Sequence, residues 1–342
     1  MHRPLRLTID RSTLQANWRW LAERAGTSAG AAVKANGYGI GAVKTVAALS
    51  DVGCRDFFVS SWAEAAALGN LSEGATVVVL HGVGPDDVEA AALSGARPCL
   101  NSVEQVQRWK QAAPDKPCDV MIDTGMNRLG LRSSEIAALD GLAIDTLHSH
   151  LACGDEDCAM NAMQLERFRA VAAAVPAKRY SLANSAGICL GRDYSFDLVR
   201  PGLALYGGIP RVEAEGHIRP VIKVEAQVVQ RRTIHAGETC GYGATFTAEA
   251  NVEAAILNIG YADGYLRGFS SHGRAFAGDS ELPVLGRVSM DLIAVDCDAA
   301  SDLKDGDWVA IDYDLPVAAR QSGLSQYELL TTLGSRFERR WV

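Results

Sequence analysis

The sequence predicts an α/β fold, a (β/α)8 (TIM) barrel followed by a mostly β C-terminal domain, on two observations. Between about residues 29 and 206, short apolar runs alternate with stretches of helical spacing, which is typical of parallel strands joined by helical crossovers. Eight such runs occur, the number that closes a barrel, although an open doubly wound sheet has a similar pattern. Past Tyr206 strand-like runs continue with almost no helix between them.

The predicted elements follow in order along the chain. Residues 6–9 alternate like a strand, and Asp10 can cap a helix that carries Leu14, Trp18 and Leu21 on one face. The barrel strands are expected at 30–35, 56–60, 76–81, 97–100, 119–123, 144–150, 179–183 and 196–200. The helices between them are expected at 41–51, 61–69, 85–94, 102–113, 133–139 and 160–175. Later strands are expected at 221–234, 253–260, 292–297 and 308–313.

These elements predict three parts of the chain. Residues 1–10 are expected to form an N-terminal strand that packs with the C-terminal domain. Residues 11–218 are expected to form the barrel, which would bind a cofactor, and residues 219–342 the β-rich domain. No internal repeat or low-complexity segment is evident.

Composition restricts the partners and the compartment. The 342 residues include 33 Lys and Arg against 41 Asp and Glu, a net charge of −8, which disfavours nucleic acid as a partner. The first ten residues are too polar for a secretory signal, and no run approaches the length of a membrane span. The 8 cysteines are scattered without framework spacing, which favours reduced thiols and a cytoplasmic protein.

In a barrel, chemistry collects at the carboxyl ends of the strands. The first strand ends in Lys34, within AAVKANGYG, where small neighbours favour a side chain that points into the barrel mouth. Loss of water around such an amine lowers its pKa and makes it a plausible Schiff-base nucleophile. The alternative is a lysine that reaches out of the rim into solvent.

Polar residues follow four further strands. Arg128, in DTGMNRLGL, offers a fork suited to a carboxylate, or could pair with Asp123. His148 and His150 lie on one side of their strand, as metal ligands do in some barrel hydrolases, but the other strand ends lack further ligands, so no metal is expected. The last two strands lead into SLANSAG and VRPGLALYG, where barrels bind phosphate. Their candidate residues are Asn184, Ser185, Arg200, Gly202 and Leu203.

A lysine nucleophile together with a phosphate site indicates pyridoxal phosphate as the cofactor. The chain also resembles the alanine racemase family, pyridoxal-phosphate enzymes built from a barrel and a β domain, over nearly its whole length. The motifs that carry the resemblance occur in the family's order: AVKANGYGIG, DTGMNRLGL, SHLACGDE, LANSAG, VRPGLALYG, GYGATFTA, IGYADGYLR, GRVSMD and SQYE.

The resemblance implies the activity and the site. The enzyme would interconvert L-alanine and D-alanine with two bases, Lys34 and Tyr242 of the partner subunit, in a head-to-tail homodimer with shared sites. It implies that the cofactor is bound by Lys34, Tyr38, His150, Asn184, Ser185, Arg200, Gly202, Leu203 and Tyr327. The substrate would be bound by Arg128, Met290 and Tyr261, with Asp155, Arg267, Arg287 and Asp291 supporting the site or its entrance. D-alanine would serve as a cell-wall precursor, or the enzyme would degrade D-alanine, and the sequence leaves both roles open.

Physical chemistry is consistent with these roles. Racemisation removes a proton from one face of a planar carbon and returns one to the other, so two opposed bases suffice. Tyr242 could be one of them if a cation such as Arg267 lowers its pKa. Arg200 can only donate, so it would leave the cofactor's ring nitrogen unprotonated and weaken the ring as an electron sink.

One position departs from the family pattern, and three alternatives stay open. Many relatives carry a carbamylated lysine where this chain has Met121, so Arg128 must be oriented otherwise, by Asp123, Asn127 or a bound anion. The alternative functions are a racemase of broader or serine preference, a decarboxylase of the same cofactor class, and a metal-dependent hydrolase that uses His148 and His150. A non-catalytic, cofactor-holding barrel is disfavoured because this chain has a β domain with Tyr242 and Met290.

Overall fold

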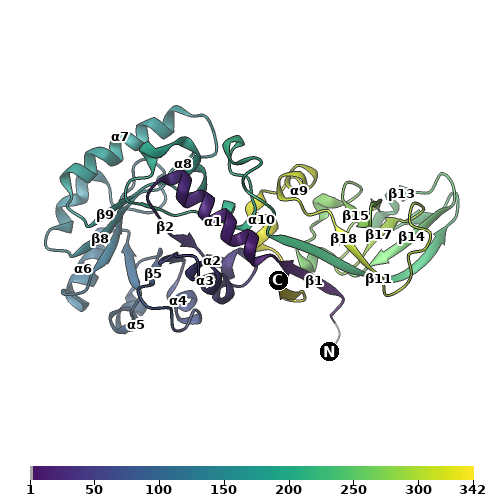
Figure 1. Ribbon diagram of the computed structural model, residues 1–342, viewed down its shortest axis with the longest axis horizontal. Coiled ribbons are helices and arrows are strands. Elements are labelled where there is room, and N and C mark those ends of the chain that lie inside the picture. Colours follow the sequence, from purple (N-terminus) through teal and green to yellow (C-terminus); the bar gives the residue numbers. More distant parts are fainter. Residues whose placement is uncertain (1–2) are drawn as a thin grey trace. The chain divides into compact units, whose positions relative to one another are not determined.

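The computed structural model describes residues 3–342, so residues 1 and 2 of the expected N-terminal strand segment lie outside the described residues. The chain divides into two compact units (Figure 1). Leu14–Arg219 form the barrel unit, and the described residues up to Thr13 together with Pro220–Val342 form the β unit. Among residues 3–342, none of the helices combines the length and the apolar character needed to cross a membrane.

The barrel unit is built on a parallel sheet whose strands follow one another in sequence order. Its seven strands are β3 (Ala31–Ala32), β4 (Asp56–Val59), β5 (Thr76–Val79), β6 (Arg97–Leu100), β7 (Cys118–Met121), β8 (Ile144–His148) and β9 (Arg179–Ser181). The eighth, β10 (Leu198–Val199), pairs with β2 (Ser28–Ala29). The Arg200 N–H donates to Ala183 O, and the Ala32 N–H to Pro201 O, both at 2.9 Å. These bonds connect β10 to both ends of the sheet and close it, which confirms the predicted (β/α)8 barrel.

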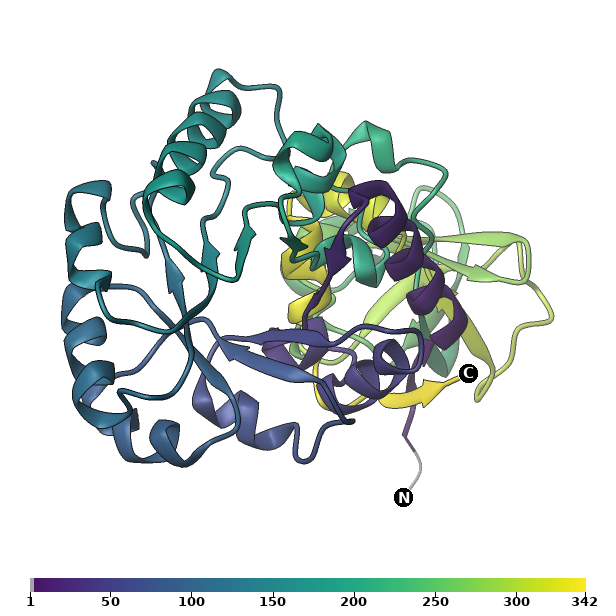
Figure 2. The same cartoon turned by 60° about the vertical axis from the view of Figure 1, so that its left-hand side comes forward.

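Helices lie outside the barrel strands, and Figure 2 shows them from dark purple through blue to teal. They are α1 (Arg11–Ala25), α3 (Ala42–Ser50), α4 (Trp62–Ala67), α5 (Val88–Leu93), α6 (Val103–Ala112), α7 (Ala159–Ala174) and α8 (Ser185–Leu190). Single 3-10 turns occur at Pro85–Asp87, Ser133–Leu139, Arg192–Tyr194, Leu203–Tyr206 and Val212–Ala214. Trp109 and Phe168 of the helices pack with Val120 and Leu147 of the strands in a buried apolar layer, which holds the strand ends in place.

The start of the chain agrees with the sequence prediction. Asp10 accepts a hydrogen bond from the Thr13 N–H at 2.9 Å, as a residue that caps a helix does. Leu14, Trp18 and Leu21 of α1 are all buried. The predicted cap and the predicted apolar face of this helix are therefore confirmed.

The β unit centres on β11 (Ile222–Ile234), which pairs with β1 (Leu5–Ile9), β14 (Val252–Leu257) and β18 (Trp308–Ile311). The remaining strands of its main sheet are β15 (Arg274–Ala277), β16 (Ser280–Leu285), β17 (Ile293–Asp296) and β19 (Glu338–Trp341). A small hairpin joins β12 (Thr239–Cys240) and β13 (Phe246–Thr247), and 3-10 turns lie at Tyr242–Ala244, Tyr261–Asp263 and Arg267–Phe269.

Two helices near the end of the β unit were not expected from the sequence. They are α9 (Leu315–Ser322) and α10 (Gln326–Thr331). Asp314 caps α9 by accepting from the Val317 N–H at 3.2 Å, and Ser325 caps α10 by accepting from the Glu328 N–H at 3.2 Å. Both capping residues stand where a helix start can be read in the sequence. Apart from these two helices after β18, the domain is mostly β, as predicted.

Candidate active site

Lys34 begins a left-handed turn at the end of β3. The segment α2 (Lys34–Tyr38) contains Ala35, Asn36 and Tyr38, whose φ angles of 51°, 54° and 51° lie in the left-handed region. An L-residue with a side chain costs roughly 1–2 kcal/mol in this conformation. The turn that follows the lysine is therefore a conformation that its neighbours must stabilise.

Lys34 lies partly buried beside charged groups. Burial lowers the pKa of its amine below the ordinary value, the nearby guanidinium of Arg128 lowers it further, and the carboxylate of Glu64 acts in the opposite direction. A lowered pKa increases the fraction of free amine, which is the form that attacks an aldehyde or accepts a proton.

His150 follows β8 and lies near the same cations. Burial lowers its pKa to about 3, and the charges of Arg200, Arg128 and Lys34 contribute to the shift. The imidazole is therefore neutral at physiological pH. A neutral ring beside three cations can pack against an aromatic cofactor without adding a fourth positive charge.

Arg128 is exposed on the loop after β7, and Met121 is buried at the end of that strand. The Asp123 carboxylate accepts from the backbone N–H groups of Gly125 and Asn127, at 2.8 and 3.1 Å. Among residues 3–342, neither Asp123 nor Asn127 has a hydrogen bond to Arg128. The expectation that one of them orients the guanidinium was wrong, because Asp123 stabilises its own turn instead.

A second group of residues forms a cradle after β9 and β10, in which the Ser185 O–H and the Leu203 N–H are the groups that can donate to a ligand. The Ser185 hydroxyl accepts from the N–H groups of Gly202 and Ala204, at 2.9 and 3.2 Å. Asn184 caps α8 by accepting from the Gly187 N–H at 2.9 Å. Leu203 begins a 3-10 turn, whose first N–H has no acceptor within the turn.

Tyr38 connects the lysine turn to this cradle. A Cβ atom added at Gly202 would lie 2.3 Å from the Tyr38 hydroxyl, so the tyrosine reaches the cradle only because residue 202 has no side chain. The Tyr38 ring stacks on Tyr206, with centroids 4.6 Å apart. Hydroxyl and N–H donors therefore converge within reach of the segment that begins at Lys34. This donor set fits a phosphate group, and the amine of Lys34 fits the aldehyde of pyridoxal phosphate.

Arg200 extends from the end of β10 into a buried network of polar residues. One of its nitrogens donates to Ser149 O at 2.6 Å, while the other donates to the Ser181 hydroxyl and lies 3.3 Å from His148 Nδ1. Burial lowers the pKa of the guanidinium to about 10, so Arg200 still carries its charge near neutral pH. A charged, donor-only group here fits the acceptor nitrogen of a pyridine ring.

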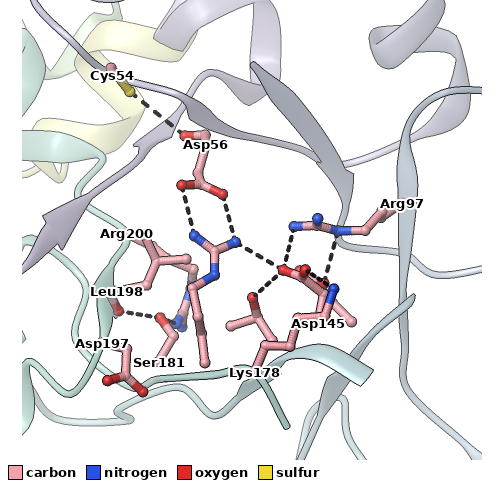
Figure 3. A network of polar contacts seen from close by, with 12 residues as sticks. Cys54, Asp56, Arg97, Asp145, Lys178, Ser181, Asp197, Leu198 and Arg200 are labelled. Carbon is pink, nitrogen blue, oxygen red and sulfur yellow. Dashed lines mark hydrogen bonds and ion pairs between the residues drawn. The ribbon is translucent and has the colours of Figure 1, made fainter. Parts of the chain in front are cut away.

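The network continues from His148 towards the starts of the strands. His148 Nε2 lies 2.9 Å from Asp119, and Asp119 lies 3.1 Å from Arg97. Beyond Arg97 the ion pairs continue through Asp145, Arg179 and Asp56, as Figure 3 shows. The sequence analysis missed this network. Its signal in the sequence is a charged residue at or next to the start of several barrel strands, among them Asp56, Asp119 and Asp145.

The position of His148 does not favour the metal-dependent hydrolase. Its two ring nitrogens face Asp119 and Arg200, and its side chain is fully buried. Within residues 3–342, no group of three or more histidine, cysteine or acidic side chains has an arrangement that could hold a metal ion. His148 and His150 also differ in surroundings, since only His150 is partly exposed.

The β unit carries the second set of predicted residues. Tyr242 and Met290 are exposed, by 67% and 53%. A hollow of about 900 Å³ lies beside Tyr242 and is lined by Arg232, Glu238, Arg287 and Ser289 among others. A Cβ atom at Gly243 would lie 2.9 Å from the Arg287 guanidinium, so Arg287 is the cation at this tyrosine's turn.

Arg267 does not have the partner that the sequence analysis considered. Its guanidinium lies over the ring of Tyr261, 5.5 Å from the centroid. No contact between Arg267 and Tyr242 is recorded among the described residues, and a cation–π interaction with Tyr261 takes its place. Of the remaining predicted residues, Asp155 is exposed on the loop after His150, and Tyr327 is exposed on α10.

Arg336 was missed by the sequence analysis although it joins two of the predicted loops. Its guanidinium forms two hydrogen bonds with the fully buried Asp263, at 2.6 and 2.7 Å, and a third with Asp291 at 2.7 Å. The Tyr261 N–H donates to Ser289 O and the Ala262 N–H to Met290 O, both at 3.0 Å. These bonds hold the loop of Tyr261 against the loop of Met290.

The fold and the site define an enzyme, a barrel with a lysine at its mouth that is followed by a β domain. Residues 9–210 match the family model of the alanine racemase N-terminal domain, and residues 221–341 match that of the C-terminal domain. The chain belongs to the alanine racemase family, whose members are isomerases.

Individual relatives agree with this assignment. Alanine racemase of Methylobacterium nodulans is 41% identical over 98% of this chain and 96% of its own length. The catabolic alanine racemase of Agrobacterium fabrum is 41% identical over 98% of this chain and 92% of its own. The crystal structure of alanine racemase from Bartonella henselae with covalently bound pyridoxal phosphate has a TM-score of 0.93 and 38% identity, and covers all of both chains.

Proposed function

We propose that this chain is an alanine racemase that interconverts L-alanine and D-alanine with pyridoxal phosphate bound through Lys34. One observation carries the proposal: the turn that begins at Lys34 ends in Tyr38, whose hydroxyl reaches the Gly202 side of the donor cradle. An amine with a lowered pKa and one hydroxyl that reaches the cradle, that of Tyr38, are thus parts of one segment. Pyridoxal phosphate needs both at once, one for its aldehyde and one for its phosphate.

When bound, pyridoxal phosphate withdraws electrons from the substrate and makes the proton on its Cα acidic. Lys34 Nζ accepts this proton on one face or returns it, because its lowered pKa leaves part of the amine unprotonated. Tyr242 of the partner subunit serves the other face. Arg200 keeps its charge and donates to the ring nitrogen, which limits how far electrons spread into the ring.

The remaining residues bind and orient. Arg128 receives the substrate carboxylate, because its guanidinium is exposed and has no recorded hydrogen bond or ion pair within residues 3–342. Met290 contributes backbone contacts to the same carboxylate, and Tyr261 narrows the site so that alanine fits best. The neutral His150 packs against the cofactor ring. The phosphate is held by Tyr38, Asn184, Ser185, Gly202, Leu203 and Tyr327, and Asp155, Arg267, Arg287 and Asp291 support the entrance.

We propose further that the enzyme is a head-to-tail homodimer with shared sites. Tyr242 and Met290 are large side chains that are more than half exposed in the single chain, which fits a surface that a second copy covers. The parts of each subunit would be the N-terminal strand 1–10, the barrel 11–218 and the β domain 219–342. The enzyme would act in the cytoplasm and supply D-alanine for the cell wall, with neither nucleic acid nor a membrane as a partner.

The activity is tested with purified protein and pyridoxal phosphate. We expect L-alanine to yield D-alanine and the reverse, and borohydride to attach the cofactor irreversibly to Lys34. L-serine is the comparison substrate, because the second candidate is a racemase of broader or serine preference in the same family. Equal turnover of serine and alanine would support that candidate, and release of carbon dioxide would overturn the racemase.

A further inference from the structure

The carboxylate of Glu64 bridges two strand ends beside Lys34. Glu64 Oε1 accepts from the Ala35 N–H at 2.7 Å, and Glu64 Oε2 accepts from the Ser60 N–H at 2.7 Å. Ala35 follows Lys34 after β3, and Ser60 follows β4. Each oxygen of one side chain therefore holds the backbone of a different strand end.

Capping of α4 explains only one of these two bonds. Glu64 is the third residue of α4, and its own N–H donates to the capping hydroxyl of Ser61 at 3.3 Å. The same arrangement starts α6, where Gln105 N–H donates to Ser102 at 3.3 Å and Gln105 Oε1 accepts from the Asn101 N–H at 2.9 Å. A glutamine thus suffices for the bond to the residue before the N-cap. The bond from the Ala35 N–H to the other oxygen of Glu64 is therefore not explained by the start of α4.

That second bond is made to the first residue of the left-handed turn. Ala35 has φ 51° and ψ 47°, and its N–H points at the Glu64 carboxylate. A side chain at such a φ is strained, so the conformation persists only where surrounding contacts impose it. A hydrogen bond from N–H to a carboxylate is among the strong ones and holds Ala35, and with it the preceding Lys34, in position.

Glu64 also brings a negative charge to a region rich in positive charge. Arg128 lies near Lys34, and His150, which lies near both, is neutral. Of the charged groups that act on Lys34, Glu64 is the one that favours the protonated amine, against burial and Arg128. Its charge therefore partly balances that of Arg128.

We propose that Glu64 is a positioning residue for Lys34, which holds the left-handed turn after the lysine through Ala35 and supplies a negative charge that acts on its amine. The proposal deepens the proposed function and rests on it, since that function gives Lys34 its task. Glu64 acts through Ala35 and through its charge, and does not itself exchange a proton with the substrate.

The test compares Glu64→Gln with Glu64→Asp and with a matched control, Glu135→Gln. Glu135 Oε2 likewise accepts from a backbone N–H at a helix start, that of Arg132 at 2.8 Å, before the 3-10 helix Ser133–Leu139. Glutamine at position 64 keeps one acceptor oxygen, so it can cap α4 but cannot also accept from Ala35. Glu64→Gln is expected to weaken cofactor binding by about ten- to a hundredfold, and Glu135→Gln by less than about twofold.

The direct measurement is the titration of Lys34 in the full-length chain after the cofactor has been removed. Reductive ¹³C-methylation followed by NMR reports each lysine, and Lys34→Ala identifies the signal. Glu64→Gln is expected to lower the pKa of Lys34 below that of the parent chain, because a charge that favours the protonated amine is gone. Glu64→Asp keeps that charge, so its Lys34 pKa should be closer to that of the parent chain. These results do not require racemase activity, so they separate failure of this proposal from failure of the proposed function.

A double variant distinguishes the role of Glu64 in the left-handed turn from its role at the start of α4. Glycine adopts a positive φ without strain, so Ala35→Gly is expected to restore most of the cofactor affinity that Glu64→Gln loses. If Glu64→Gln alone is too unstable to purify, the rescued double variant provides the titration, and the absence of any rescue overturns the role in the turn. The proposal as a whole is overturned if the Glu64→Gln variant has the same pKa of Lys34 and the same cofactor affinity as the parent chain.

Discussion

His148 Nε2 lies 2.9 Å from Asp119 Oδ2, and both side chains are fully buried. Because a carboxylate only accepts, the proton of the neutral imidazole lies on Nε2, and Nδ1 is left to accept from Arg200. The pKa of His148 is lowered, first by burial, which is consistent with a neutral ring. Asp119 therefore determines which atom His148 presents to Arg200.

Asp119→Asn is expected to destabilise the barrel unit and to disturb Arg200. The substitution removes one partner of a buried ion pair with Arg97, which costs about 3 kcal/mol. Urea unfolding measures this loss, and cofactor affinity reports on Arg200. Asp115→Asn, at an exposed position of the same unit, is the control and should stay within about 0.5 kcal/mol of the parent chain. Equal stability of the two variants would contradict the structural role of Asp119.

Subunit mixing tests the shared site. Lys34→Ala and Tyr242→Phe are each expected to be nearly inactive as homodimers. In a mixed dimer, one of the two sites combines an intact Lys34 with an intact Tyr242. Random exchange of subunits should therefore restore about a quarter of the parent activity, since half of the dimers are mixed and each has one intact site. No recovery after verified exchange would mean that both bases come from one chain.

Gly202→Ala is expected to weaken cofactor binding. The new Cβ would lie 2.3 Å from the Tyr38 hydroxyl, so the tyrosine must leave the cradle. Loss of one hydrogen bond to a charged phosphate predicts roughly tenfold weaker binding or more, measured by absorbance titration of the cofactor-free chain. Gly95→Ala is the control, because a Cβ at Gly95 would meet open space. Parent-like affinity in Gly202→Ala would argue against Tyr38 as a phosphate donor.

Arg336→Met is expected to lower the free energy of unfolding by about 3 kcal/mol, because it leaves the buried Asp263 carboxylate without its cation. It should also raise KM for alanine more than it lowers kcat, because Tyr261 and Met290 would lose their fixed spacing. Arg340→Met is a matched control. Arg336 and Arg340 are both 44% exposed, but Arg340 pairs with the exposed Glu338 and should contribute about 0–1 kcal/mol. If Arg336→Met lowers the free energy of unfolding no more than the control does, Arg336 does not hold the two loops together.

The pH dependence of stability is expected to reflect His150. Its pKa is about 3 in the folded chain, against the ordinary value of 6.5, so the unfolded chain binds the proton more tightly. The contribution to stability is fully present above pH 6.5 and is lost as the pH falls towards 3. His150→Gln in the cofactor-free chain should flatten the dependence of the unfolding free energy on pH across this window. An unchanged slope would contradict the lowered pKa.

Local patterns predicted much of this molecule. Eight strand positions, the cap at Asp10 and the placement of Lys34 at a strand end all follow from periodicity and neighbouring residues, and the structure has them. Asp314 and Ser325 were equally readable as helix caps, and the missed helices α9 and α10 reflect too much weight on the strands around them.

Long-range pairs account for what the sequence could not predict. Arg336 and Asp263 are 73 residues apart, and no local signal distinguishes this arginine from its neighbours Arg339 and Arg340. Likewise, Arg267 stacks on Tyr261 although charge alone made Tyr242 an equally reasonable partner. The left-handed backbone after Lys34 includes Ala35 and Tyr38, residue types that rarely have a positive φ, so this conformation could not be predicted from them.

The pairing of the first strand sets the order in which the chain can complete its fold during synthesis. Strand β1 ends at Ile9, and its two partners are β11, which begins at Ile222, and β19, which ends at Trp341. The barrel strands are all made between β1 and β11, so the barrel can form before β1 has either of its partners. The β unit is complete only after β19 has been made, and loss of that strand would leave β1 with one edge unpaired.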